Sequence, residues 1–232
     1  MRHDACPPLR LSVVIPALNE AAGIAAALQA LAPLLARGAQ LLLADGGSQD
    51  DTVALGRTGG AQVIDAPRGR ALQMNAGAQQ ASGNLLLFLH ADTRLPPDAD
   101  RLIEQALANG TQVWGRFDVR IEGKPWMLRV IAAFMNRRSR WTGIATGDQA
   151  LFMTRAAFDA VGGFPAQPLM EDIEISRRLL KLSRPACLRA RVVTSGRRWE
   201  TRGVWPTVLL MWRLRLAYWR GVAPERLAEL YR

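Results

Sequence analysis

Two patterns of apolar residues alternate along the first half of the chain. Short continuous runs, such as Leu85–Leu89 ("LLLFL"), are separated by longer segments in which apolar residues recur every three or four positions. Short runs are typical of strands buried on both faces, and the longer period is typical of amphipathic helices. The pattern predicts strands at 9–16, 39–45, 61–66 and 83–92, and helices at 19–38, 48–59, 69–82 and 97–110.

This alternation, with short connections, favours a mostly parallel sheet with helices on both faces. The second half is less regular, but it also combines the two patterns. Strands are predicted at 111–121, 148–155 and 185–196, and helices at 124–141, 156–164, 170–182, 203–222 and 223–232. Because no repeat or low-complexity linker interrupts the chain, we expect a single α/β domain over 1–232 with a helical C-terminus.

Composition narrows the class of protein. The chain is 49% hydrophobic, enough for a substantial core, yet no run reaches the roughly 18 to 20 apolar residues of a membrane-spanning helix. The N-terminal residues 1–10 lack the apolar region of a secretory signal. Two cysteines, Cys6 and Cys187, form neither a disulfide framework nor a metal site, so we expect a cytoplasmic protein with free thiols.

Charge is distributed unevenly. Residues 1–110 carry 8 Lys and Arg against 10 Asp and Glu, a net of −2, whereas residues 111–232 carry 22 against 10, a net of +12. The basic half is expected to meet an anionic partner, and nucleic acid, an anionic membrane and a phosphorylated substrate all qualify. The alternative is a basic face that only contacts solvent.

Polar residues follow the carboxyl ends of four predicted strands. The candidates at these ends are Pro16, Ala17, Asn19 and Glu20; Asp45, Gly46 and Ser48; Arg68 and Arg70; and His90 with Asp92. In open α/β sheets such ends meet at one edge and bind ligands there, so we expect one shared crevice. Each candidate also has a plainer interpretation as a turn residue, a helix cap or a solvated side chain.

Four segments, in order, resemble the family 2 glycosyltransferases with the GT-A fold. They are "SVVIPALNE", "ADGGSQDDT", "FLHADT" and "PLMEDIEISRRL", and the resemblance covers residues 11–200. The segments "FLHADT", "GDQALF" and "RRW" are similar to a bacterial subgroup named radical-SAM/selenodomain-associated transferases. The resemblance implies a nucleotide-sugar-binding half at 11–110, an acceptor and catalytic half at 111–200, and amphipathic helices at 201–232.

The resemblance also implies a nucleotide-diphosphate sugar as donor and a divalent cation, Mg²⁺ or Mn²⁺. Asp45 is expected to accept a hydrogen bond from the base, and the 16–20 turn to line the nucleoside pocket. Arg68 or Arg70 would meet the base or the phosphates. The family's metal motif is Asp-x-Asp, and "HAD" stands in its place, which leaves Asp92 as the expected metal ligand. His90 has three open roles, namely metal ligation, a bond to the ribose, or packing.

An inverting transfer needs one general base, which by resemblance is Asp172, with Glu171 beside it. The alternative is that these acids only complement the dipole of a helix. Asp148 and Gln149 are expected to line the sugar pocket. The segment "GRRW" resembles the Gln-x-x-Arg-Trp motif of processive members but lacks the Gln. By this resemblance, the three remaining residues, Arg197, Arg198 and Trp199, are expected to contact the pyrophosphate and an acceptor ring.

The sequence thus predicts a metal-dependent inverting glycosyltransferase whose acceptor is unknown. A lipid-linked acceptor is one alternative, because the segment "VWPTVLLMWRLRLAYWRG" mixes apolar residues with arginines. This segment either touches a membrane, at the inner face, or covers the sheet or a homodimer interface. A non-catalytic sugar-nucleotide binder remains as a rival.

Two further rivals are disfavoured. A nucleotidyltransferase would carry a Gly-rich loop after the first strand, where this chain has "PALNE". A nucleic-acid-binding protein would lack acidic strand ends, so no nucleic acid is expected as partner.

Overall fold

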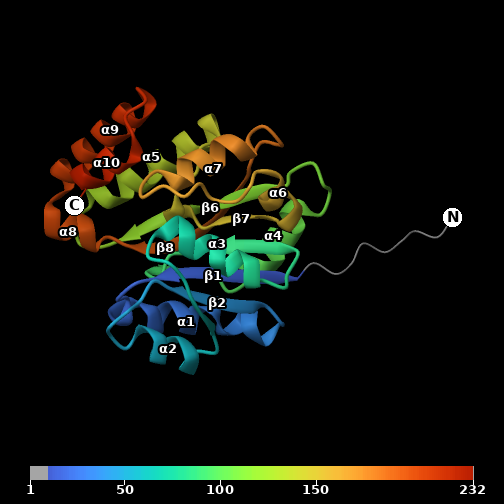
Figure 1. The fold of residues 1–232 in the computed structure, drawn as a ribbon. Helices are drawn as coiled ribbons and strands as arrows, with labels where there is room; N and C mark the ends of the chain where they lie inside the picture. Colours follow the sequence, from blue (N-terminus) through green and yellow to red (C-terminus); the bar gives the residue numbers. More distant parts are fainter. Residues whose placement is uncertain (1–9, 232) are drawn as a thin grey trace.

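A mixed sheet runs through the middle of the molecule, with helices on both sides (Figure 1). The computed structural model describes residues 10–231, so Cys6 and the segment examined for a signal sequence lie outside the described residues. Cys187 is a half-buried free thiol. The strands are β1 (Leu11–Ala17), β2 (Gln40–Asp45), β3 (Gln62–Asp65), β4 (Leu85–Phe88), β5 (Thr93–Arg94), β6 (Trp114–Glu122), β7 (Leu151–Thr154) and β8 (Ala186–Ser195).

Helices connect and cover these strands. They are α1 (Ala21–Ala36), α2 (Thr52–Thr58), α3 (Arg70–Gln80), α4 (Ala99–Leu107), α5 (Met127–Thr142), α6 (Arg155–Ala160), α7 (Glu171–Leu179), α8 (Arg197–Arg202), α9 (Val204–Trp219) and α10 (Pro224–Tyr231), with a short 3-10 turn, η1, at Gly147–Gln149. Between residues 10 and 231, no helix combines the length and apolar character needed to cross a bilayer.

The strand order is β3-β2-β1-β4-β7-β6-β8-β5. The first four strands of this order are parallel, and β6 pairs in parallel with β8, whereas β7 is antiparallel to both of its neighbours. The antiparallel β7 lets β6 and β8 point the same way as β1 and β4. The carboxyl ends of these four strands therefore reach one edge of the sheet, and the predicted α/β fold is confirmed.

Side chains of β1 show why both faces of the sheet are covered. Val13 and Ile15 belong to one apolar cluster, which contains buried residues of α1, α4 and α5. Val14, between them, belongs to a second cluster with residues of α3, α6 and α7. Alternate residues of a strand point to opposite faces, so a continuous apolar strand needs a helical layer on each side.

Three local predictions differ from the structure. The strand expected to reach Asp92 ends at Phe88, and His90 and Asp92 lie in the turn that follows it. The two-residue β5 and the short α8 were not predicted as separate elements. The continuous sheet includes strands from both predicted halves, and the boundaries at 110 and 200 remain predictions.

Candidate active site

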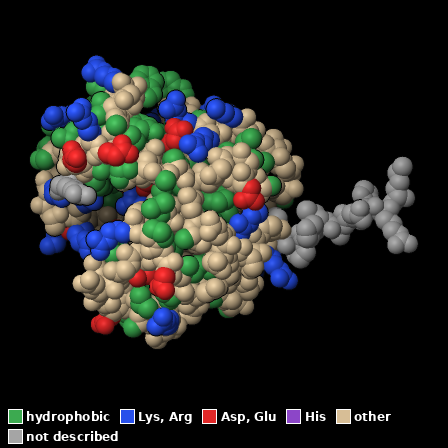
Figure 2. Space-filling model, viewed as in Figure 1, with side chains coloured by type: hydrophobic (Ala, Val, Ile, Leu, Met, Phe, Trp, Pro, Cys, Tyr) green, Lys and Arg blue, Asp and Glu red, His purple; other side chains and the backbone are tan. Residues whose placement is uncertain are grey.

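The carboxyl edge of the sheet opens into a cavity of about 650 Å³, whose other walls come from α5, α7, α8 and α9. Figure 2 shows a hollow beside the C-terminal helices, bordered by basic side chains. The predicted site residues that line the cavity are Pro16, Glu20, Arg70, His90, Asp92, Asp148, Glu171, Asp172, Arg197, Arg198 and Trp199. The structure thus brings together residues from six separate segments of the chain.

The remaining predicted residues lie outside the cavity wall. They are Ala17, Asn19, Asp45, Gly46, Ser48, Arg68 and Gln149. Arg68 is exposed in the loop before α3, and Ala17 and Asp45 are the last residues of β1 and β2. The others lie in the turns that follow these two strands or in η1. These turns are fixed by hydrogen bonds that hold the lining residues in place.

The Asp45 carboxylate organises the turn that follows β2. One oxygen accepts from the backbone N–H groups of Gly47 and Ser48, at 3.0 and 2.9 Å, and the other accepts from the Ser48 hydroxyl. The same hydroxyl accepts from the backbone N–H of Asn19 at 2.9 Å. Asp45 therefore links the ends of β1 and β2, where the parallel strands separate.

Sequence reasoning missed Gln73, a buried amide on α3. Its Nε2 donates to the carbonyls of Ala17, at 2.6 Å, and Ala44, at 3.0 Å. A Cβ at Gly46 would lie 2.9 Å from the same nitrogen, so glycine is needed there for close approach. Nothing in the local pattern marks Gln73, because its two partners come from distant strand ends.

His90 pairs with Asp148 across the cavity floor. Its Nδ1 lies 3.2 Å from Asp148 Oδ1. A Cβ added at Gly147 would lie 2.3 Å from its Nε2. Burial raises the pKa of Asp148, but the hydrogen bond from His90 and the charge of Arg70 outweigh it, so the net shift is downward. Both imidazole nitrogens are thus directed at the Gly147–Asp148 turn.

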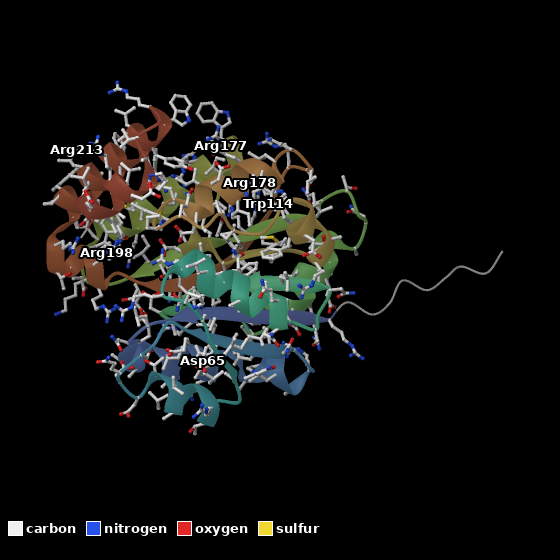
Figure 3. All side chains as sticks on the ribbon, in the orientation of Figure 1. Asp65, Trp114, Arg177, Arg178, Arg198 and Arg213 are labelled. Carbon is white, nitrogen blue, oxygen red and sulfur yellow. The ribbon has the colours of Figure 1, made fainter. Side chains whose placement is uncertain are left out.

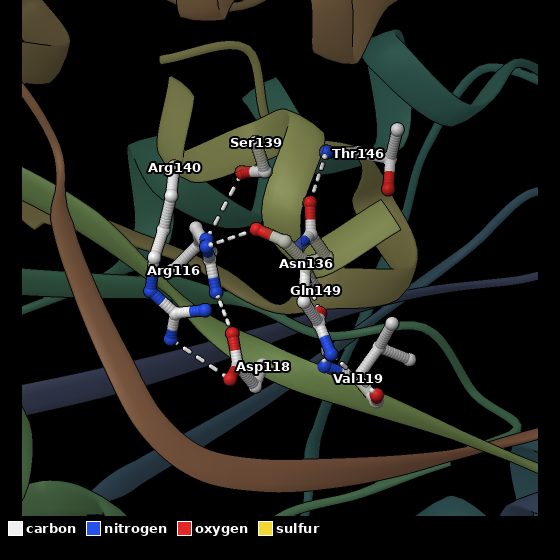
Figure 4. A network of polar contacts seen from close by, with 8 residues as sticks. All are labelled: Arg116, Asp118, Val119, Asn136, Ser139, Arg140, Thr146 and Gln149. Atoms are coloured by element: carbon white, nitrogen blue, oxygen red, sulfur yellow. Dashed lines mark hydrogen bonds and ion pairs between the residues drawn. The ribbon is translucent and has the colours of Figure 1, made fainter. Parts of the chain in front are cut away.

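Gln149 supports this turn from behind, in a buried network shown in Figure 4. Its side chain accepts from the Thr146 backbone N–H at 3.2 Å and donates to the amide of Asn136, on α5, at 3.4 Å. Asn136 in turn bonds both the N–H and the carbonyl of Val119, on β6. Gln149 therefore fixes the loop that carries Asp148 and does not project into the cavity.

The first turn of α7 carries the two predicted catalytic carboxylates. Asp172 Oδ2 accepts from the Gly147 N–H at 3.0 Å, and Glu171 lies 3.4 Å from Arg70 Nη1. Burial, followed by the negative charge of Glu171, raises the pKa of Asp172 to about 6. A carboxylate with this pKa is suited to accept a proton near neutral pH.

Backbone strain concentrates around the cavity. Among residues 10–231, the non-glycine residues with positive φ are Asn19 (55°), Ala150 (49°) and Met170 (67°). Asn19 precedes Glu20, Ala150 follows η1, and Met170 precedes Glu171. Such conformations carry a free-energy penalty of about 1–3 kcal/mol each and often mark functional loops.

Arginines from α5 and α8 also line the cavity. Arg198, labelled in Figure 3, lies on α8 with its guanidinium carbon 4.2 Å from the centre of the Tyr231 ring. Arg138, on α5, also lines the cavity, and its Nε and Nη2 are buried without a hydrogen-bond partner among the described residues. Burial lowers the pKa of Arg138, an effect that the charge of Asp172 opposes.

The family model described as "Glycosyl transferase family 2" matches residues 12–164. These residues run from β1 to the loop after α6 and include the turns after β1, β2 and β4. The chain belongs to glycosyl transferase family 2. A curated relative of this glycosyltransferase is the "PGL/p-HBAD biosynthesis glycosyltransferase Rv2957" of Mycobacterium tuberculosis (strain ATCC 25618 / H37Rv). The two are 37% identical over 102 residues, which cover 41% of this chain and 40% of the relative.

Solved structures share the fold of the glycosyltransferase at low sequence identity. The mannosyltransferase PcManGT from Pyrobaculum calidifontis, in complex with GDP-Man and Mn²⁺, has a TM-score of 0.67 and 18% identity, covering 96% of this chain and 69% of its own. S. aureus TarS 1-349 has a TM-score of 0.65 and 16% identity, with coverages of 81% and 60%. Glucosyl-3-phosphoglycerate synthase from Mycobacterium tuberculosis, with Mn²⁺ and UDP, has a TM-score of 0.60 and 19% identity, with coverages of 80% and 71%.

Two carboxylates in the cavity fit a divalent cation that substrate phosphates would help to hold. Among the described residues, no three His, Cys, Asp or Glu side chains gather as a preformed metal site. Asp92 and Glu20 both line the cavity. Burial raises the pKa of Glu20, and the negative charge of Asp92 raises it further. Mg²⁺ is commonly bound by one or two carboxylates with substrate phosphates and water, so this carboxylate pair suits such a cation.

Proposed function

We propose that the chain transfers a sugar from a nucleotide-diphosphate donor to a hydroxyl acceptor, with inversion and with a divalent cation. The observation that carries the proposal is one cavity holding both Asp92, a carboxylate suited to a cation, and Asp172, a carboxylate suited to take a proton. The structural relatives with GDP-Man and Mn²⁺, or with UDP and Mn²⁺, support this donor class.

The donor would lie along the strand ends. The turn from Pro16 to Glu20 is proposed to hold the nucleoside, with Asp45 near the base, while Arg70 meets the phosphates. Asp92 would hold the cation, Mg²⁺ or Mn²⁺, which neutralises charge on the pyrophosphate when bound. Asp148, fixed by His90, would contact hydroxyl groups of the sugar.

Asp172 is proposed to act on the acceptor. It removes the proton of the acceptor hydroxyl as that oxygen bonds to the anomeric carbon. The bond from the anomeric carbon to the donor phosphate oxygen breaks, and the nucleoside diphosphate leaves with the electron pair. Arg197 and Arg198, which line the same cavity, would stabilise the developing negative charge.

Arg138 supports an acceptor that carries an anionic group. Its two buried, unpartnered nitrogens would gain charge-assisted hydrogen bonds from a phosphate or carboxylate that entered the cavity. Trp199, also in the cavity wall, offers an apolar surface to an acceptor ring. We propose a cytoplasmic site for this reaction, as the free thiols suggested.

A thermal-shift series tests the donor class. UDP and GDP, each with and without Mg²⁺ or Mn²⁺, are expected to raise the melting temperature, and the cation should increase the effect. Slow hydrolysis of a bound nucleotide sugar then distinguishes an enzyme from a non-catalytic binder. The non-catalytic alternative is tested because His90 replaces the first aspartate of the motif. Absence of a shift with any nucleotide would contradict the proposal.

A further inference from the structure

Helix α5 exposes an apolar stripe to solvent. Trp126, just before the helix, is 72% exposed, Phe134 is 55% exposed and Trp141 is 86% exposed. Together with Val130 they recur at spacings of four, four and seven residues, which places them on one face of a helix. An exposed stripe with two tryptophans is unusual for a helix whose other face already packs on the core.

Helix α9 exposes a second stripe. Trp205, Leu209, Trp212, Leu216 and Trp219 are all exposed and recur every three or four residues. The opposite face of α9 is also apolar, with Leu214 buried against Leu227 of α10. The sequence predicted one apolar stripe on this helix, whereas the structure shows apolar residues on both faces and leaves one of them without a partner.

The two stripes form one surface, here named the α5–α9 surface. The rings of Phe134 and Trp212, both exposed, lie with their centres 6.4 Å apart. Val130 and Trp205 line the same cavity as Asp172. The mouth of the candidate active site therefore opens within the α5–α9 surface.

Charge indicates what covers this surface. Met127–Thr142 contains four arginines, Val204–Trp219 contains two, and neither helix contains Asp or Glu. Arg129, Arg137 and Arg213 are exposed, and Figure 3 shows Arg213 on the outer side of α9. Apolar side chains, tryptophans and arginines on one face, without acids, are typical of helices that lie in the interface of an anionic membrane.

We propose that the α5–α9 surface docks this protein on an anionic lipid membrane, with the cavity mouth at headgroup level. A symmetric dimer through the same surface would place each cationic face against its own copy, which like-charge repulsion disfavours. This inference goes beyond the proposed transfer reaction. It would let an acceptor carried by a lipid reach Asp172 without leaving the interface.

Vesicle sedimentation tests the proposal with the full chain. The protein is mixed with vesicles of phosphatidylcholine alone, or of phosphatidylcholine with phosphatidylglycerol, at low and at high salt. We expect sedimentation with the anionic vesicles and release as salt rises, because exposed charges are screened over about 8 Å at physiological ionic strength. Light scattering without vesicles should show a monomer.

Two sets of variants separate the contribution of the apolar side chains to membrane binding from that of the arginines. The triple variant Trp126→Ser, Leu209→Ser, Trp219→Ser should no longer sediment, and Arg129→Gln with Arg213→Gln should weaken binding to anionic vesicles by about tenfold or more. None of these residues lines the cavity, so nucleotide diphosphates should still raise the melting temperature of both variants. Leu72→Ser, on α3, and Arg57→Gln, on α2, are exposed controls outside both helices of the surface, and each should bind like the wild type.

Three results would overturn the proposal. They are a wild-type protein that does not sediment with anionic vesicles at low salt, a triple variant that binds as well as the wild type, or a wild-type dimer that the triple variant converts to a monomer. The last result would assign the surface to a second copy of the chain. If nucleotides stabilised neither the wild type nor any variant, the proposed reaction would be contradicted. The sedimentation result would still test the membrane proposal, because it does not depend on nucleotide binding.

Discussion

The imidazole Nδ1 of His90 lies 3.2 Å from Oδ1 of Asp148, which joins the turn after β4 to the turn before β7. His90 stands where the first aspartate of the family's Asp-x-Asp motif is expected. A second carboxylate at that position would face Asp148 and repel it. At this position His90 therefore supplies a hydrogen-bond donor that fixes Asp148, where the motif would place a carboxylate.

The pair predicts different effects for two substitutions of His90. His90→Leu leaves the half-exposed Asp148 carboxylate without its donor and should lower the free energy of unfolding by about 0.5–1.5 kcal/mol. His90→Asn can still donate to Asp148 and should lose less than half of that amount. Urea denaturation measures both variants, and equal losses would show that the imidazole acts through packing alone.

Asp92 is predicted to couple the cation to the donor. Asp92→Ala should abolish the additional stabilisation that Mg²⁺ or Mn²⁺ gives to bound nucleotide diphosphate, because it removes the main protein ligand. The melting temperature without ligands should stay close to that of the wild type. Asp65→Ala is the control, since Asp65 is an aspartate at the end of the parallel strand β3 and lies outside the cavity wall. An unchanged metal effect in Asp92→Ala would contradict the assignment.

Gln73 is predicted to be the structural link under the donor site. Gln73→Leu has similar size but leaves the carbonyls of Ala17 and Ala44 without their side-chain donor. We expect a loss of about 1–3 kcal/mol in the free energy of unfolding, with weaker nucleotide binding as the strand ends move. Gln80→Leu, on the exposed end of the same helix, should change neither quantity. Normal nucleotide affinity in Gln73→Leu would show that the strand ends hold their positions without it.

Much of the fold could be predicted because its signals are local. The run from Leu85 to Phe88 is a fully buried strand, and the alternation of such runs with helical periods indicated the parallel part of the sheet. β5 has only two residues, and it exists because Thr93 and Arg94 pair with the distant β8. No local pattern encodes a strand of that length.

The candidate site could be predicted only in part, for the same reason. Strand-end positions drew attention to Glu20, Arg70, His90 and Asp92, and topology brings them into one cavity. The exposed stripe of α5 could not be recognised as exposed, since an apolar stripe on a helix usually faces a core. The partner of a side chain, its exposure to solvent and its orientation depend on contacts between segments that are distant in the sequence.

Asp172 is predicted to act in the chemical step and not in donor binding. Asp172→Asn should bind nucleotide sugar normally but hydrolyse it, with water in place of the acceptor, about 10²- to 10⁴-fold more slowly. Glu171→Gln is the comparison, and its effect should be milder because Glu171 is buried against Arg70. If Glu171→Gln alone lost turnover, the base would be Glu171. If both variants kept turnover, Asp148 would be the next candidate.

The same substitution should stabilise the protein at neutral pH. The pKa of Asp172 is raised from 3.8 to about 6, so the folded state holds its proton more tightly than the unfolded state does. The free energy of unfolding therefore falls as pH rises from about 4 to about 6, and the penalty for an ionised Asp172 is fully present above that range.

Asp172→Asn removes this penalty. At about pH 8 it should raise the free energy of unfolding by up to roughly 3 kcal/mol, and below about pH 4, where the wild-type carboxyl is protonated in both states, the two proteins should be equally stable. Urea denaturation at several pH values measures the difference. Glu174→Gln, on the same helix turn but paired with Arg178, should show no such gain at high pH. A variant that is less stable than the wild type at about pH 8 would mean that the Asp172 carboxylate stabilises its helix and is not held in a destabilised, basic form.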